Sequence, residues 1–426
     1  MEFKKALLHN FSWKIAGMLL TFLNNLIIVR ILGAEDSGPF FYSIAIFTLF
    51  STVIKLGIEN GIVFIASRYP EKSKALFVFL LLLIAVQIFV VWLVVSVFRY
   101  EKPIGSGWIV SFIIANTFFY YITAFFQAQK RFISINIINT MILALQLVFF
   151  SLIFWNRNIL FVQNDNNIGN IFSILTLFTV VQMIILSLWY LKGSNGPVLI
   201  NDLNKTVSEL FKFSGVNYLI TIIFFLITRA DFYFIEKYCS QQVLGNYTQI
   251  ARLSQMALVI PGLLGGVLFP YSINSDESFK KKILFICRIM TAVSLVLFAC
   301  ILVFGKQLFP WLLGYDFTLV YPGFAAIFPG VFCMSLSLLF VSYFEGVNKQ
   351  KYILYAYLLT LIIIIVADLV FVHRYGFIAA SIIFSAANFI GMMVLISKFR
   401  KNSFMKISDL LLISTADLKK IKAIFQ

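Results

Sequence analysis

The chain has 426 residues, of which 61% are hydrophobic and 12% are charged, and its mean hydropathy is +0.94. Soluble domains contain roughly 45–50% apolar and about 25% charged residues, so this composition excludes a soluble globular protein. The net charge of +16 does not indicate nucleic-acid binding, because that function needs a basic soluble surface and the apolar runs leave no soluble domain to carry one.

Apolar runs follow one another along the whole chain. A helix that crosses the roughly 30 Å hydrocarbon core needs about 20 mostly apolar residues. Runs such as Ala75–Val97 and Leu358–Val372 lack the alternation of outer-membrane strands, which excludes a β-barrel. We predict an all-α integral membrane protein with about twelve transmembrane helices. The expected spans are 10–32, 39–66, 75–97, 107–128, 132–155, 168–190, 213–236, 245–270, 282–304, 318–343, 352–372 and 375–398.

The basic residues fix the expected orientation. Of the 34 lysine and arginine residues, 23 lie in the tail and in the alternate loops that share its side, against 7 in the other loops. Because cytoplasmic loops carry the excess of lysine and arginine, both termini are predicted to be cytoplasmic. Residues 399–426 place Leu418, Ile421 and Phe425 on one helical face beside lysines, which is typical of an amphipathic helix that contacts anionic membrane lipids.

Three sequence matches in the same order indicate an internal duplication. They pair Phe11-Ser12 with Phe213-Ser214, residues 32–40 with 243–247, and residues 125–132 with 343–352. We therefore predict an N-terminal six-helix bundle at 1–200, a C-terminal six-helix bundle at 201–398 and a cytoplasmic tail at 399–426. Parallel repeats of this kind place the substrate site between the two bundles, near the bilayer midplane.

The same segments resemble a known family. The matching residues are Asn10-Phe11-Ser12-Trp13, Arg30-Ile31-Leu32-Gly33 with Gly38, Leu56-Gly57, Gly245-Asn246-Tyr247, and Gly314 after Trp311-Leu312-Leu313. Over residues 5–398 the chain is similar to the polysaccharide-biosynthesis flippases of the Wzx (O-antigen translocase) type, within the multidrug/oligosaccharidyl-lipid/polysaccharide (MOP, MATE-like) exporter superfamily. The resemblance implies two bundles forming a V around a central cavity. It also implies a lipid-linked oligosaccharide on undecaprenyl pyrophosphate as substrate, moved across the bacterial inner membrane for surface polysaccharide synthesis. A polysaccharide polymerase and a chain-length regulator are the implied partners.

Polar residues form stripes on several of the predicted helices, and such faces cannot turn toward lipid. Four cations at membrane depth are candidates for binding the substrate pyrophosphate, since arginine and lysine would compensate its desolvation: Lys14, Lys55, Arg229 and Arg252. Uncharged polar candidates for the cavity are Asn24, Asn25, Asn116, Asn217 and Gln255. Aromatic candidates for stacking on sugar rings are Tyr120, Tyr121, Tyr218, Phe224 and Phe225.

Three buried acids have two interpretations. Glu59, Asp231 and Asp368 are candidates for a site that binds a coupling ion, either H⁺ or Na⁺. Alternatively they pair with the cations, Glu59 with Lys55 and either aspartate with Arg229. No other cofactor is predicted, and the four cysteines lack the spacing of a metal site.

Other functions fit the sequence less well. The chain lacks a GxxxxGK[ST] loop for ATP hydrolysis. A membrane glycosyltransferase would need long outer loops with clustered carboxylates, and the longest here is about 156–167, so no enzyme activity is predicted. A MATE-like drug/cation antiporter and a lipid II-type flippase remain as alternatives, although cationic drugs favour acidic cavities.

Overall fold

A computed structural model describes residues 3–97, 104–129, 131–156, 167–193, 203–272 and 277–400, and regular structure within these ranges is entirely helical. The predicted tail helix and the predicted long outer loop lie almost wholly outside these residues. The chain divides into two compact units, residues 1–218 and 219–426.

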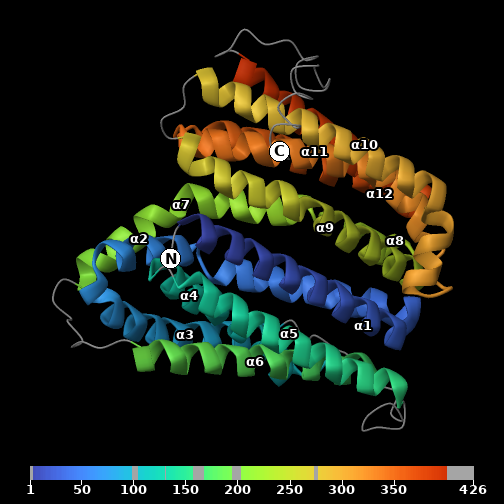
Figure 1. Ribbon diagram of the computed structural model, residues 1–426. Coiled ribbons are helices and arrows are strands. Elements are labelled where there is room, and N and C mark those ends of the chain that lie inside the picture. The colour runs from blue at the N-terminus through green and yellow to red at the C-terminus, as the bar shows by residue number, and fades with distance from the viewer. Residues whose placement is uncertain are drawn as a thin grey trace. The chain divides into compact units, whose positions relative to one another are not determined.

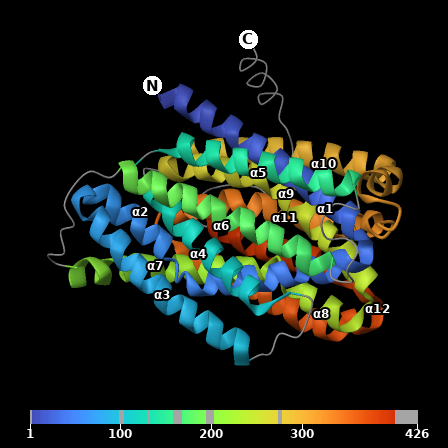
Figure 2. The ribbon, with the colours of Figure 1, turned by 90° about the horizontal axis from the view of Figure 1, so that it is seen from below.

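The first unit is a bundle of long helices (Figure 1). Its elements are α1 (Phe3–Ile54), α2 (Ile58–Arg68), the short 3₁₀ helix η1 (Pro70–Lys72), α3 (Ser73–Val97), α4 (Ser106–Ala128), α5 (Phe132–Trp155), α6 (Asn167–Gly193) and most of α7 (Leu203–Ile227). The second unit contains the end of α7, α8 (Ala230–Tyr238), α9 (Gln241–Ser272), α10 (Glu277–Leu313), α11 (Val320–Gly346) and α12 (Gln350–Arg400). Within it, α8 lies beside α12 in both views (Figures 1 and 2).

Two of these elements each contain a pair of spans. A straight helix of the 52 residues in α1 would be about 78 Å long, well beyond the bilayer core. Gly33 interrupts α1 with φ 71°. Figure 1 shows that α1 reverses direction along its length, and we call the parts of α1 before and after Gly33 its first and second arms. Gly376 interrupts α12 in the same way with φ 64°. Glycine suits both positions because it has no Cβ to clash in this backbone region. The turn at Gly33 falls between the predicted spans 10–32 and 39–66, whereas the turn at Gly376 falls at the second residue of the predicted span 375–398.

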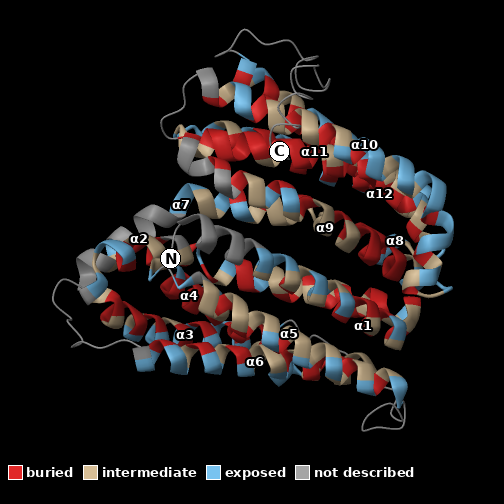
Figure 3. Cartoon of the chain, in the orientation of Figure 1, coloured by how far each residue is buried: buried red, intermediate tan, exposed pale blue. Residues whose placement is uncertain are grey.

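The two units share a packing pattern. In the first unit α4 packs against α2, α3 and α6, and α1 packs against α5. In the second unit α11 packs against α9, α10 and α12, and α8 packs against α12. The fourth predicted span of each half, α4 or α11, is therefore the centre of its bundle, and these are the two most buried candidate spans of the described chain (Figure 3). Equivalent central helices are what a duplicated chain would have.

The described residues contain nine helices that are long and apolar enough to span a membrane. The glycine breaks split two of these, and α9 supplies a further long helix, which is compatible with about twelve spans. The protein is thus an all-α, multi-pass membrane protein, as predicted. Two predicted spans are not continuous helices. Span 39–66 is broken between Ile54 and Ile58, and span 213–236 is broken between Ile227 and Ala230.

Candidate functional site

The break in the second span lies at Lys55-Leu56-Gly57. Leu56 and Gly57 both adopt left-handed backbone conformations, with φ 54° and 66°. A glycine in this conformation commonly ends a helix, but a leucine there is strained and persists only where its surroundings hold it. The α1 helix therefore stops at Ile54, and α2 starts again at Ile58.

Side chains from three helices bind the carbonyl groups at this helix end. Tyr218 of α7 donates a hydrogen bond to the Val53 oxygen at 2.5 Å, and Gln87 of α3 donates to the Ile54 oxygen at 2.8 Å. Tyr121 of α4 donates to the Lys55 oxygen at 3.2 Å and accepts a hydrogen bond from Gln87 at 3.0 Å. In lipid, an unpaired backbone group costs several kcal/mol, so these side chains make an interrupted helix tolerable.

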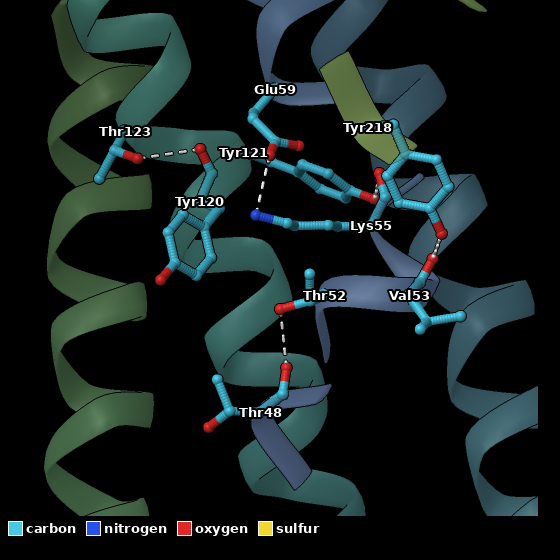
Figure 4. Close-up of polar contacts among 9 residues, drawn as sticks. All are labelled: Thr48, Thr52, Val53, Lys55, Glu59, Tyr120, Tyr121, Thr123 and Tyr218. Carbon is cyan, nitrogen blue, oxygen red and sulfur yellow. Dashed lines mark hydrogen bonds and ion pairs between the residues drawn. The ribbon is translucent and has the colours of Figure 1, made fainter. Parts of the chain in front are cut away.

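Lys55 is the cation of this break (Figure 4). Its ammonium lies 2.8 Å from Glu59 Oε1 and 4.2 Å from the centroid of the Tyr120 ring, and the residue is only 6% exposed. The second carboxylate oxygen of Glu59 and the amide oxygen of Gln87 are buried without a hydrogen-bond partner. We call Lys55, Glu59, Gln87, Tyr120, Tyr121 and Tyr218 the Lys55 cluster. Within it, Lys55 and Glu59 form the ion pair that the sequence offers as the alternative to an ion-coupling role for Glu59.

The second unit contains a comparable break at Thr228-Arg229. The Thr228 hydroxyl donates to the Phe225 carbonyl at 2.9 Å, which binds an oxygen of the last turn of α7. Arg229 then leaves the helical conformation, with φ −144° and ψ −14°. In both breaks a cation follows the end of one helix and an acid lies in the first turn of the next, Glu59 in α2 and Asp231 in α8. This order suits the helix dipoles, whose negative end favours cations and whose positive end favours acids.

Arg229 contacts another predicted substrate-binding residue of the second unit, Gln255. Its Nη2 donates to Gln255 Oε1 at 2.7 Å, and its Nη1 donates to the Thr228 carbonyl at 3.2 Å. Its guanidinium also lies 5.3 Å from the ring of Phe232. Arg252 of α9 lies close enough to Arg229 for the two positive charges to interact. Two positive charges in this region together favour a nearby anion.

The two aspartates of the second unit lie near each other. Asp231 is 3% exposed, accepts a hydrogen bond from the Tyr247 hydroxyl, and accepts another from the Phe232 amide at 3.1 Å. Asp368 of α12 is fully buried, and neither of its carboxylate oxygens has a hydrogen-bond partner. An ionised Asp368 would be repelled by the carboxylate of Asp231. A buried carboxylate with no donor either carries a proton or binds a cation, because an isolated charge is very costly there.

The remaining predicted residues lie elsewhere. Lys14 is on the first arm of α1 with an exposed side chain, and Asn116 and Asn217 are half-buried on α4 and α7. Asn24 donates to the Leu143 carbonyl of α5 at 2.9 Å and so joins α1 to α5. Asn25 is buried beside it.

The sequence reasoning missed two residues of these clusters. Gln87 is the single amide within the apolar run Ala75–Val97, and a lone polar residue at membrane depth is itself a signal that the helix contacts a polar partner there. Tyr247 belongs to the Gly245-Asn246-Tyr247 motif, which carries the family resemblance, and its hydroxyl binds Asp231.

The sequence profile of the family described as "Polysaccharide biosynthesis protein" matches residues 4–276. The chain belongs to this family. The match begins in α1 and ends just after α9, so it includes both helix breaks, and it confirms the family predicted from the motifs. No curated protein sequence matches the chain.

Solved structures show the fold of this family member. It is similar to a mutant of the MATE transporter VcmN of Vibrio cholerae, with 12% identity, a TM-score of 0.66 and coverage of 95% of this chain and 99% of that one. The lipid II flippase MurJ is similar with 13% identity, a TM-score of 0.67 and coverage of 98% and 91%. A MOP superfamily transporter from Pyrococcus furiosus has 14% identity, a TM-score of 0.59 and coverage of 94% and 95%. The fold is thus that of MOP superfamily transporters.

Proposed function

We propose that this polysaccharide biosynthesis protein is a flippase. It moves oligosaccharide units linked to undecaprenyl pyrophosphate from the cytoplasmic to the outer leaflet of the bacterial inner membrane, with both of its own termini in the cytoplasm. The proposal is carried by the family membership together with a cation at a helix break in each unit, Lys55, which is buried, and Arg229, which is half-buried.

The charged groups support an anionic substrate. The Arg229–Arg252 pair offers planar donor groups that bind phosphate oxygens in pairs. Gln255, already bound to Arg229, orients one of the two guanidinium groups. Lys55 is neutralised by Glu59 and has further N–H donors, because an ammonium carries three and one is used by the carboxylate. In this proposal these residues bind the pyrophosphate of the substrate: Lys55, Arg229, Arg252 and Gln255.

The acids divide into two roles in this proposal. Glu59 is the counterion of Lys55, and Asp231 with Asp368 forms the site for a coupling ion, H⁺ or Na⁺. The unpartnered oxygens of Asp368 support this assignment, because they offer acceptors in a place where water is scarce.

Reconstitution in vesicles tests the function. The purified protein is placed in vesicles with an undecaprenyl-pyrophosphate-linked oligosaccharide, and the fraction of oligosaccharide accessible from the opposite side is measured over time with a sugar-binding lectin or a glycosidase. We expect movement that the Arg252→Gln variant loses. Transport of a cationic drug in place of the oligosaccharide would contradict the proposal and indicate a drug/cation antiporter. Movement of lipid II alone would indicate a lipid II-type flippase.

A further inference from the structure

An apolar groove crosses the first unit beside the Lys55 cluster. It has a volume of about 360 Å³ and is formed by the second arm of α1, the second half of α3 and the start of α4. Its surface is entirely apolar. Two of its α1 residues, Phe50 and Val53, are 41% and 43% exposed, so the groove opens onto the outer surface of the bundle. Hydrocarbon is the chemistry that fits such a wall.

The groove ends at the Lys55 cluster on α1 and within one turn of it on α3, and it stops about two turns short of it on α4. On α1 its last lining residue is Ile54, which directly precedes Lys55 and whose carbonyl binds Gln87. On α3 the lining residue Val91 lies one turn, about 6 Å, from Gln87. On α4 the lining residue Ile113 lies about 12 Å from Tyr121. An apolar groove that leads to the ammonium group of Lys55 matches an amphiphile with an anionic group at one end of its hydrocarbon chain.

We propose that this groove binds the isoprenoid chain of the lipid-linked substrate, with the anionic end of the lipid at the Lys55 cluster. This inference rests on the proposed function and adds a second contact region to it. Ligand pockets usually measure about 300–1,000 Å³, so a cavity of about 360 Å³ takes a stretch of one chain and not the two chains of a phospholipid.

The predicted orientation agrees with this occupant. With both termini in the cytoplasm, the second arm of α1 starts at the outer surface and reaches Lys55 near mid-depth, so the groove lies in the outer half of the bilayer. A lipid taken from the cytoplasmic leaflet points its chain outward. When its anionic group has risen to the level of Lys55, its chain therefore lies in the half of the membrane where the groove is.

Photolabelling of the full-length protein tests the groove. The protein is incorporated into nanodiscs of phosphatidylethanolamine and phosphatidylglycerol and labelled with a sugar-free polyprenyl diphosphate that carries a diazirine in its chain. Mass spectrometry of peptides should find the label on residues 46–54 and 90–95. The Val94→Trp variant fills the groove, and it should lower this labelling by about tenfold because the larger side chain occupies the space of the lipid chain.

The adjacent residue gives a matched control. Leu93 is 45% exposed and does not line the groove, so Leu93→Trp should leave the labelling unchanged. If Val94→Trp does not fold, Ile109→Phe fills the same groove from α4 and decides the question. Equal labelling of these peptides by a phosphatidylglycerol with the same diazirine, or labelling that ignores both groove variants, would overturn the proposal.

The labelling and transport experiments fail separately. Specific labelling of the groove in a protein that moves no lipid-linked oligosaccharide would refute the proposed function. Full transport by a protein whose groove takes no label would refute the groove alone.

Discussion

Gln87 donates a hydrogen bond from its side-chain amide to the carbonyl oxygen of Ile54 at 2.8 Å, so a residue of α3 binds the helix end that the break in α1 exposes. The same amide donates to Tyr121, whose hydroxyl donates in turn to the Lys55 carbonyl. A single glutamine therefore supports two of the three carbonyls at the break.

Replacing this glutamine should destabilise the protein. Gln87→Met keeps the approximate volume but leaves the Ile54 oxygen without its donor, which should cost about 1–3 kcal/mol. Thermal unfolding in detergent, followed by tryptophan fluorescence, would show a lower midpoint. Ile88→Met is the control, because Ile88 is the next residue of the same helix and is 43% exposed. Equal midpoints for the two variants would show that the break does not depend on Gln87.

The arginine pair should be required for transport but not for folding. Loss of one charge-assisted contact to a phosphate costs roughly 1.5–3 kcal/mol, so Arg252→Gln should slow flux by about 10- to 150-fold. Because glutamine keeps a hydrogen-bonding side chain at position 252, the amount of folded protein should stay unchanged. Lys237→Gln, at an exposed position of α8, is the control. Normal surface polysaccharide in cells that carry Arg252→Gln would exclude contact with the substrate.

Lys55 and Glu59 can be separated by a double substitution. Lys55→Ala alone leaves the Glu59 carboxylate without its ion-pair partner and should lower the protein level in the membrane. The double variant Lys55→Ala with Glu59→Ala should restore the level. If Lys55 also binds the substrate, surface polysaccharide stays absent in the double variant, as judged by immunoblot against membrane fractions matched for protein. Restored polysaccharide would mean that Lys55 only pairs with Glu59.

The source of energy can be tested at Asp368. A pyrophosphate dianion that moves outward is favoured by an inside-negative potential by roughly 2.3 kcal/mol per charge per 100 mV, so the potential alone is a sufficient driving force. If Asp231 and Asp368 bind a coupling ion, flux in vesicles should also respond to an imposed pH or sodium gradient. Asp368→Asn should remove that response and leave the response to the potential. Wild-type flux that follows only the potential would refute ion coupling.

The sequence predicts the fold to a large extent, because a continuous apolar run of about 20 residues has few alternatives in a bilayer. The runs mark the spans: Gly33 lies between two predicted spans, and Gly376 lies one residue inside the predicted start of the last one. The i, i+4 spacing of Lys55 and Glu59 also predicts their ion pair, although the structure forms it across the helix break and not along one continuous helix.

The helix breaks could not be predicted in the same way. Lys55-Leu56-Gly57 and Thr228-Arg229 lie inside the predicted spans 39–66 and 213–236, and the donors that permit the first break come from distant segments. On a helical wheel of the predicted span 213–236, Arg229 lies off the polar stripe formed by Ser214, Asn217, Thr221, Thr228 and Asp231. A helical wheel assumes one unbroken helix, whereas Arg229 stands between two.

Side chains of α3, α4 and α7 hydrogen-bond the carbonyls of residues 53–55. The second span can therefore act as a hinge at this point, and its stiffness depends on neighbouring helices. In an intact helix, bending resistance comes from the peptide chain, which every sequence shares. At this hinge, the resistance to bending comes from the side chains of Gln87, Tyr121 and Tyr218. Resistance to bending can therefore be altered by a single codon without touching the charged residues, which makes stiffness a property that can diverge independently of substrate chemistry.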